Sequence, residues 1–196
     1  MASTTLRDLS NLDRTPAPLA DSVLVLIDLQ NTYTRGPLEL DGWDAALDSA
    51  AALLARARAA GTPVIHVQHD GGAGSHYDIR GESGAIHDRV APIEGERVVV
   101  KQAPDSFRGT DLGELVDAAG RKDLVLAGFM THMCVAFTAQ GAFLRGDRPT
   151  VVADACATRP LGTAVAEVTA AQLHHSALAT VADLYGLVVP TAEALS

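Results

Sequence analysis

The sequence is poor in features that mark several protein classes: cysteine, long apolar runs and positive charge. Its 196 residues include two cysteines, too few for the disulfide framework of a small secreted protein. No stretch approaches the roughly 18 consecutive apolar residues that a membrane-spanning helix needs. The net charge of −9 disfavours partners that are themselves anionic. We therefore expect a soluble protein that binds neither nucleic acid nor a membrane.

The N-terminal segment lacks the continuous apolar core of a secretory signal peptide. Together with the scarcity of cysteine, this indicates a cytoplasmic protein in a reducing compartment. The chain length suits one domain with a sizeable core. We expect residues 1–196 to form a single domain, with residues 1–20 as an N-terminal arm.

What the sequence does contain is an alternation of short apolar runs with longer segments of helical spacing. The predicted strands are 22–28, 63–67, 97–101, 123–128, 150–154 and 186–190. The predicted helices are 43–61, 110–120, 131–145 and 164–183. Such alternation implies βαβ units, and right-handed crossovers place helices on both faces of a sheet. The predicted fold is a three-layer α/β/α, Rossmann-like domain with a mostly parallel sheet of about six strands.

Three residues with ionisable or nucleophilic side chains follow predicted strands. Asp28 closes the first strand, Lys101 closes the third, and Cys134 follows the fourth at the start of a predicted helix. In parallel sheets, ligands bind beyond the carboxyl ends of the strands, so the three are expected at one edge. Singly, each also fits a structural role. As a group they supply a proton acceptor, a cation and a nucleophile.

The local setting of Cys134 decides between a buried hydrophobe and a nucleophile. If Thr131 caps the helix, Cys134 lies in its first turn, where backbone N–H groups are unpaired and the helix dipole is positive. This setting favours a thiolate over a thiol. The other cysteine, Cys156, follows a different strand without such a setting, and we expect it to be structural.

Three stretches of the chain match a known pattern. They are "LVLIDLQN", "VVVKQAPDSFRGTDL" and "LVLAGFMTHMCVAFTAQGAFLRG", the last with a G-x-x-T-x-x-C-V motif after a strand. In this order they resemble the isochorismatase-like cysteine hydrolases, a superfamily of nicotinamidases, N-carbamoylsarcosine amidases, ureidoacrylate-type amidases and isochorismatases. The resemblance extends from about residue 22 to residue 190.

The resemblance implies a catalytic triad of Asp28, Lys101 and Cys134. It also implies a cis peptide bond between Phe129 and Met130, which aims the backbone N–H groups of Met130 and Cys134 at one point as an oxyanion hole. Relatives in this superfamily are commonly homodimers or homotetramers. The resemblance calls for no cofactor.

The activity implied is hydrolysis of a C–N bond of a small molecule through a thioester intermediate. The substrate can be an amide, a carbamoyl compound or a lactam, as for the streptothricin hydrolases of this superfamily. Two alternatives are an isochorismatase-type vinyl-ether hydrolase, which does not rely on this cysteine, and a non-catalytic binding protein that keeps the fold. In a third, Cys134 is a redox sensor, although the sequence places no resolving cysteine beside it.

Substrate contacts are expected near the strand ends and from the long, glycine-rich loop 68–96. The candidates are Gln30, Tyr33, His69, Phe107 and His132. Nicotinamidases usually carry an Asp-x-His metal motif after the second strand. Here the chain reads "HVQHDGG", which does not reproduce that motif, so no metal site is predicted.

Overall fold

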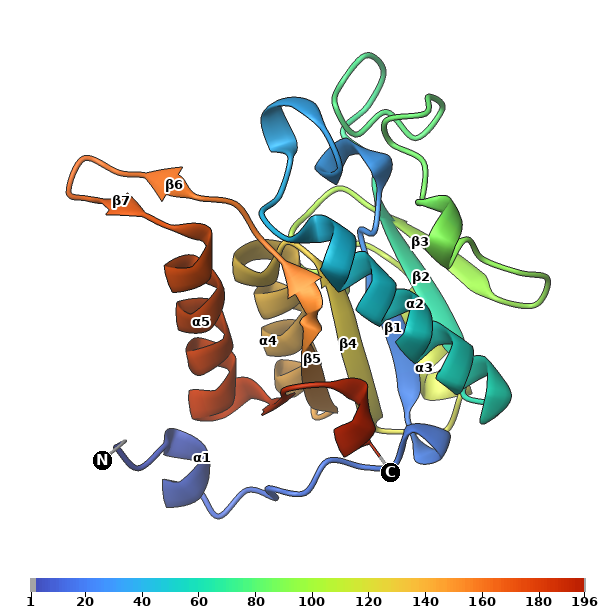
Figure 1. Ribbon diagram of the computed structural model, residues 1–196. Coiled ribbons are helices and arrows are strands. Elements are labelled where there is room, and N and C mark those ends of the chain that lie inside the picture. The colour runs from blue at the N-terminus through green and yellow to red at the C-terminus, as the bar shows by residue number, and fades with distance from the viewer. Residues whose placement is uncertain (1–2, 196) are drawn as a thin grey trace.

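The computed structural model describes residues 3–195 and has a six-stranded parallel sheet at its centre (Figure 1). The sheet order is β3-β2-β1-β4-β5-β8, and every neighbouring pair is parallel. The strands of this sheet are β1 (Val23–Ile27), β2 (Val64–His69), β3 (Arg97–Lys101), β4 (Asp123–Phe129), β5 (Arg148–Ala157) and β8 (Leu187–Val189). The predicted α/β/α architecture is confirmed.

Helices cover both faces of the sheet. The α-helices are α1 (Leu6–Leu9), α2 (Trp43–Ala59), α3 (Leu112–Ala118), α4 (Ala136–Arg145) and α5 (Ala170–Thr180). Helix α2 packs on one face, while α3, α4 and part of α5 contribute to a separate apolar cluster on the other. The strands between them are therefore buried on both sides, which is why they read as continuous apolar runs.

Strand β1 shows this burial residue by residue. All five of its side chains are buried. Leu24 and Leu26 join the cluster that contains α2, whereas Val23, Val25 and Ile27 join the opposite one. Alternate side chains of a strand point to opposite faces, so β1 is held from both sides and fixes the position of the residue that follows it.

The prediction for the last helix was wrong at its start. Helix α5 begins at Ala170, and the residues before it form a hairpin of β6 (Leu161–Gly162) and β7 (Glu167–Val168) that projects from the body (Figure 1). A reciprocal capping box between Thr169 and Gln172 sets the boundary. Alanines, which favour helices, occur both before and after Ala170, so amino-acid composition alone did not indicate where the helix begins.

The two edges of the sheet differ in what surrounds them. In Figure 1 the loops after β1 and β2 lie at the top, beyond the carboxyl ends of the strands. The N-terminal arm, here residues 3–20, runs along the opposite edge at the bottom of the view. None of the helices within residues 3–195 is long and apolar enough to cross a membrane.

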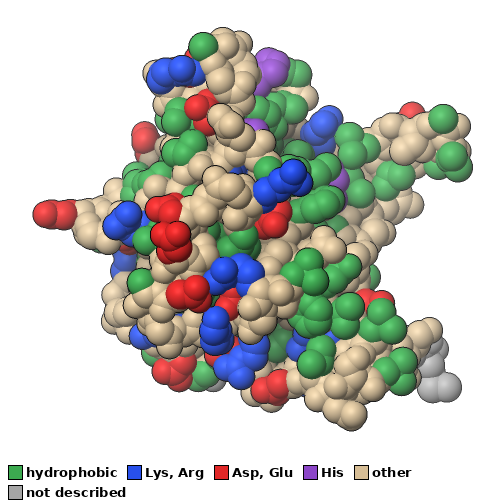
Figure 2. Space-filling view, turned by 180° about the vertical axis from the view of Figure 1, so that it is seen from behind, with side chains coloured by type: hydrophobic (Ala, Val, Ile, Leu, Met, Phe, Trp, Pro, Cys, Tyr) green, Lys and Arg blue, Asp and Glu red, His purple; other side chains and the backbone are tan. Residues whose placement is uncertain are grey.

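One helical face is left uncovered. Phe137 and Leu144 lie seven residues apart on α4 and are 45% and 73% exposed. From behind, hydrophobic side chains gather at the lower right, on the side of the molecule that carries α4 and α5 (Figure 2). Such a face suits contact with another chain. The predicted homo-oligomer stays a prediction.

Candidate active site

Asp28 follows β1 directly and is fully buried, with a left-handed backbone (φ 51°) that aspartate tolerates better than most residues. The neighbouring β4 approaches it closely at Gly128. A Cβ on Gly128 would lie 2.0 Å from the carbonyl oxygen of Ile27, so only glycine fits there. The strand ends that carry the acid and lead to the cysteine are thus in close contact.

Lys101, the last residue of β3, lies between the acid and the cysteine. Its Nζ is 2.7 Å from Oδ2 of Asp28, and both side chains have no exposed surface. The same Nζ donates to Sγ of Cys134 at 3.3 Å and lies 3.3 Å from Nδ1 of His69. An ammonium group has three N–H donors, so these contacts account for all of them. The structure therefore places the three strand-end residues in one buried cluster.

The protonation state of this cluster differs from the expectation for the cysteine. Burial raises the pKa of Cys134 to about 12, and Asp28 adds to this effect while Lys101 opposes it. Burial also raises the pKa of Asp28, against the effect of Lys101. Burial acts to lower the pKa of Lys101, but Asp28 and Cys134 outweigh it and raise that pKa. At neutral pH Cys134 is therefore a thiol, whereas its place at the start of a helix had suggested a thiolate.

The N-cap of the helix that carries Cys134 is Met130, one residue before the Thr131 expected from the sequence. A π-helical turn runs over Thr131–Val135, and α4 continues from it. The carbonyl of Met130 accepts hydrogen bonds from the N–H groups of Met133 and Val135, and the Cys134 N–H is not among its donors. Thr131 is anchored to α5 through a 2.9 Å contact between its Oγ1 and Nδ1 of His174. The peptide bond between Phe129 and Met130 is cis.

Gln30 lies beside the cluster, but its amide is used by the backbone. Its Nε2 donates to the carbonyls of His69 and Gly84, at 3.0 and 2.6 Å, and its Oε1 accepts from the His69 N–H at 2.9 Å. Gln30 is completely buried. In this structure it joins the end of β2 to the long loop, and its amide has no donor left for a substrate.

Aromatic rings line the approach to the cluster. Tyr33 packs edge-on against Phe129 and against Tyr77, which comes from the long loop. Tyr77 in turn packs against His69, with ring centroids 4.8 Å apart. The Tyr33 hydroxyl donates to the Tyr77 hydroxyl at 3.3 Å. The loop between β2 and β3 thereby contributes a ring to the wall around Lys101.

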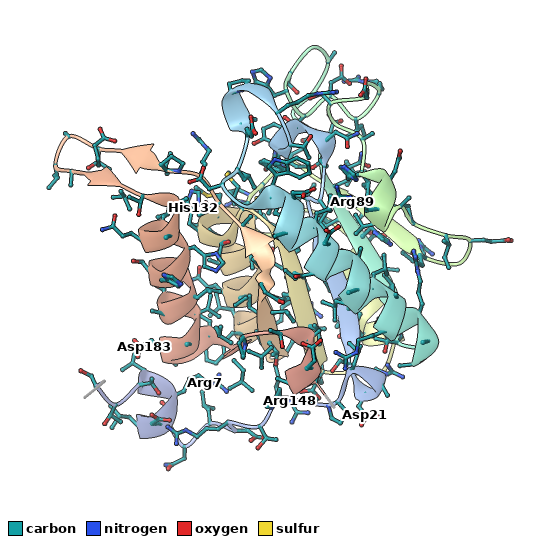
Figure 3. The ribbon with its side chains drawn as sticks, in the orientation of Figure 1. Arg7, Asp21, Arg89, His132, Arg148 and Asp183 are labelled. Carbon is teal, nitrogen blue, oxygen red and sulfur yellow. The ribbon has the colours of Figure 1, made fainter. Side chains whose placement is uncertain are left out.

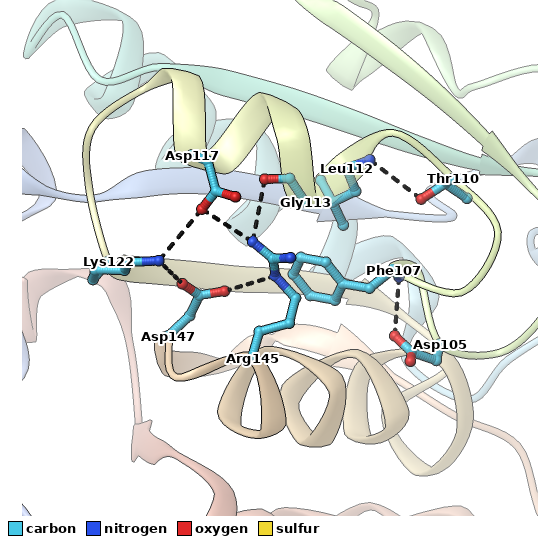
Figure 4. A network of polar contacts seen from close by, with 9 residues as sticks. All are labelled: Asp105, Phe107, Thr110, Leu112, Gly113, Asp117, Lys122, Arg145 and Asp147. Atoms are coloured by element: carbon cyan, nitrogen blue, oxygen red, sulfur yellow. Dashed lines mark hydrogen bonds and ion pairs between the residues drawn. The ribbon is translucent and has the colours of Figure 1, made fainter.

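Two predicted substrate contacts lie in other surroundings. Phe107 packs under the guanidinium of Arg145, 5.2 Å from the ring centroid, in a charged network between α3 and α4 (Figure 4). His132 is half-buried, and its Nδ1 lies 2.5 Å from Oγ1 of Thr158 at the end of β5. His132 thus borders the edge that carries the cluster, whereas Phe107 stabilises the packing of helices.

The sequence reasoning missed Arg159. It follows β5, so the strand-end rule that selected the other residues also applies to it. Burial first, and then the positive charge of Arg159, lower the pKa of His132. The same charge acts on Tyr77, where it opposes the raising of the pKa by burial. Arg159 directly follows Thr158, whose Oγ1 contacts His132, and its charge also acts on Tyr77 of the long loop.

Within residues 3–195, no three His, Cys, Asp or Glu side chains come together in an arrangement that could hold a metal ion. Two histidines of the long loop have other partners: His69 contacts Lys101, and His87 caps a short turn with its Nδ1.

Known proteins are similar to this chain over most of its length. The family model described as the isochorismatase domain matches residues 22–193. A crystal structure of an isochorismatase from Pseudomonas putida KT2440 is 40% identical, with a TM-score of 0.95, and the match covers 98% of this chain and 99% of that one. The secreted isochorismatase effector Isc1 of Verticillium dahliae is 38% identical over 95% of this chain and 97% of its own length. Maleamate amidohydrolase of Pseudomonas putida is 35% identical, over 69% of this chain and 72% of its own.

Proposed function

Because this chain belongs to the isochorismatase family, we propose that it is an amidohydrolase that cleaves a C–N bond of a small molecule with Cys134 as nucleophile. The observation that carries the proposal is the contact of one buried ammonium, on Lys101, with both the Asp28 carboxylate and the Cys134 sulfur. A nucleophile, a base and a cation at one strand edge are the groups that acyl transfer requires. The name of the maleamate amidohydrolase relative supports the same bond type.

The first half of the reaction forms a thioester. Asp28 accepts the thiol proton as the sulfur of Cys134 attacks the carbonyl carbon, which forms the S–C bond and moves the carbonyl π electrons to oxygen. The N–H groups of Met130 and Cys134 stabilise that oxyanion. As it collapses, the C–N bond breaks, and the protonated Asp28 gives its proton to the departing ammonia or amine.

The second half regenerates the enzyme. Asp28, again a carboxylate, takes a proton from water as the water oxygen attacks the thioester carbonyl. Collapse of this second oxyanion breaks the C–S bond, releases the carboxylic acid and returns the proton to sulfur. The raised pKa of Asp28 suits the two steps in which it accepts a proton, because a more basic carboxylate is a better proton acceptor.

The contact of the Lys101 ammonium with the Cys134 sulfur favours the thioester route over vinyl-ether cleavage, which does not rely on this cysteine. The experiment is a release assay for ammonia or amine over primary amides, N-carbamoyl compounds and lactams, with isochorismate as a further substrate. When the reaction with a hydrolysed substrate is stopped with acid, we expect the acyl group of that substrate to remain on the peptide that contains Cys134. Mass spectrometry of that peptide would detect it as added mass. Efficient hydrolysis of isochorismate without any such adduct would instead identify the alternative activity.

Arg159 indicates which charge the amide substrate carries. The five half-buried arginines of residues 3–195 are Arg7, Arg56, Arg58, Arg121 and Arg159. The other four each donate a hydrogen bond to a carbonyl or carboxylate, whereas Arg159 has no such partner in that range and its Nε is buried. A partly desolvated cation without a counter-ion favours an anion beside it. The substrate we propose is therefore an amide that also carries a carboxylate.

Replacing Arg159 with glutamine is expected to raise KM for anionic amides about 10- to 100-fold, the worth of one or two hydrogen bonds to a charged group. Turnover at saturation should change little, because the residue binds the part of the substrate that does not react. The neutral amide of the same skeleton serves as the comparison substrate and should lose nothing. An equal loss for both substrates would show that Arg159 acts through the fold and has no contact with an anion.

A further inference from the structure

A cavity lies at the edge of the sheet opposite the cluster. Its volume is about 430 Å³, within the range of roughly 300–1,000 Å³ typical of small-molecule sites. The N-terminal arm closes it from below, and the amino ends of β4, β5 and β8 form its upper wall. In Figure 3, Arg7 and Arg148 lie at this lower edge, and His132 lies at the upper one.

The walls of this cavity are largely apolar. Leu12, Pro16 and Pro18 of the arm face Leu187, and a pair of rings closes one side. The rings belong to Phe143 and Tyr185, which pack edge-on with centroids 5.9 Å apart. Such a pair offers both a ring edge and a ring face to a flat apolar ligand.

The charged groups on the cavity wall differ in whether they already have a partner of opposite charge. Asp123 is held by a two-pronged ion pair with Arg148. Asp147, whose side chain is fully buried, is held by Arg145 at 3.2 Å and Lys122 at 3.3 Å. Each of these two carboxylates is paired with a basic side chain, so neither selects a ligand by charge. Asp13, the remaining carboxylate of the wall, accepts a hydrogen bond from the Thr15 N–H at 2.9 Å.

Arg7 is the exception. Its terminal nitrogens donate to the carbonyls of Leu184 and Asp13, at 3.1 and 2.6 Å, and its Nε is buried without a partner. None of the ion pairs within residues 3–195 includes Arg7, although the charges of Asp13 and Asp8 act on it and oppose the lowering of its pKa by burial. A half-buried guanidinium whose direct hydrogen bonds go only to neutral oxygens can take an anion as a direct partner.

We propose that this cavity is a second ligand site, distinct from the catalytic cluster, that binds a small organic anion with a flat apolar body, such as an aromatic carboxylate. The rings and prolines hold the body, and Arg7 holds the charge. Strand β4 separates the two sites by its length, about 20 Å for seven residues in an extended strand. The ligand bridges the arm and the body, because Arg7 comes from the arm and the rings come from α4 and the turn before β8.

Titration calorimetry with 2-naphthoate tests this site on the full chain. One saturable site is expected, at least tenfold weaker in Arg7→Gln and in Ala17→Trp, which fills the cavity from the arm. Arg14→Gln is the matched control. It removes the same charge from the same arm, at a residue that is exposed and paired with Asp8. The neutral analogue 2-naphthalenemethanol should bind the natural protein no better than 2-naphthoate binds Arg7→Gln.

The catalytic edge offers 2-naphthoate another cation, so Arg159→Gln is included. Binding that is lost in Arg159→Gln and kept in Arg7→Gln would overturn the proposal, as would the absence of saturable binding to the natural protein. Ala17→Trp keeps the test valid if Arg7→Gln detaches the arm, because it leaves the contacts of Arg7 in place. Equal affinities in Ala17→Trp and the natural protein would also exclude this cavity.

Discussion

Replacing Cys134 with alanine is expected to lower kcat/KM by about 10⁴-fold or more, the loss typical of removing a nucleophile that acts together with its base. Alanine leaves Asp28 without a thiol to deprotonate and the carbonyl carbon without an attacking atom. The fold should remain, since the change removes one buried sulfur atom at a cost of about 1 kcal/mol. The measurement is amide turnover together with the midpoint of thermal unfolding.

The matched control is Cys156→Ala. Cys156 is the other buried cysteine, but its Sγ donates to the carbonyl of Val152 and has no contact with the ion pair. This variant should keep turnover within a few-fold of the natural protein. If Cys134→Ala turned over as fast as Cys156→Ala, the covalent route would be excluded, and water activated directly by Asp28 would remain.

The largest expected effect on stability comes from the ion pair of Asp28 and Lys101. Replacing either partner alone, by Asp28→Asn or Lys101→Met, should lower the free energy of unfolding by about 3–5 kcal/mol, because it leaves the other charge buried without compensation. Both single variants should also be inactive. Urea denaturation followed by circular dichroism measures the loss.

The double variant separates stability from catalysis. With both charges removed, the interior holds no unpaired ion, so the double variant should be more stable than the sum of the single losses allows. Its activity should stay undetectable, since the base and the cation are both gone. Additive losses would show that the two side chains do not stabilise each other despite their 2.7 Å contact.

The sheet could be predicted because its strands are buried on both faces. Strands β1 and β4 appear in the sequence as unbroken apolar runs, and the rule that parallel strands end at one edge then brought Asp28, Lys101 and Cys134 together. These are properties of local sequence and topology. They do not depend on how individual side chains pack.

The features that the sequence did not reveal depend on packing. The pKa of Cys134 follows from burial beside Asp28, which outweighs the favourable helix start. Gln30 follows Asp28 closely enough to suggest a substrate contact, yet the carbonyl of Gly84 comes from 54 residues away to bind its amide. Arg159 looked ordinary because the absence of a partner can be seen only when all neighbours are in place.

The buried contact of Lys101 with Asp28 and Cys134 has a consequence for the sum of charges in the protein interior. One carboxylate, one ammonium and one neutral thiol add up to zero. Moving the proton from sulfur to Asp28 gives a neutral acid, an ammonium and a thiolate, which again add up to zero. The nucleophile can therefore be generated without any net ion entering or leaving a medium of low dielectric constant, and the proton needs to travel only between neighbouring side chains.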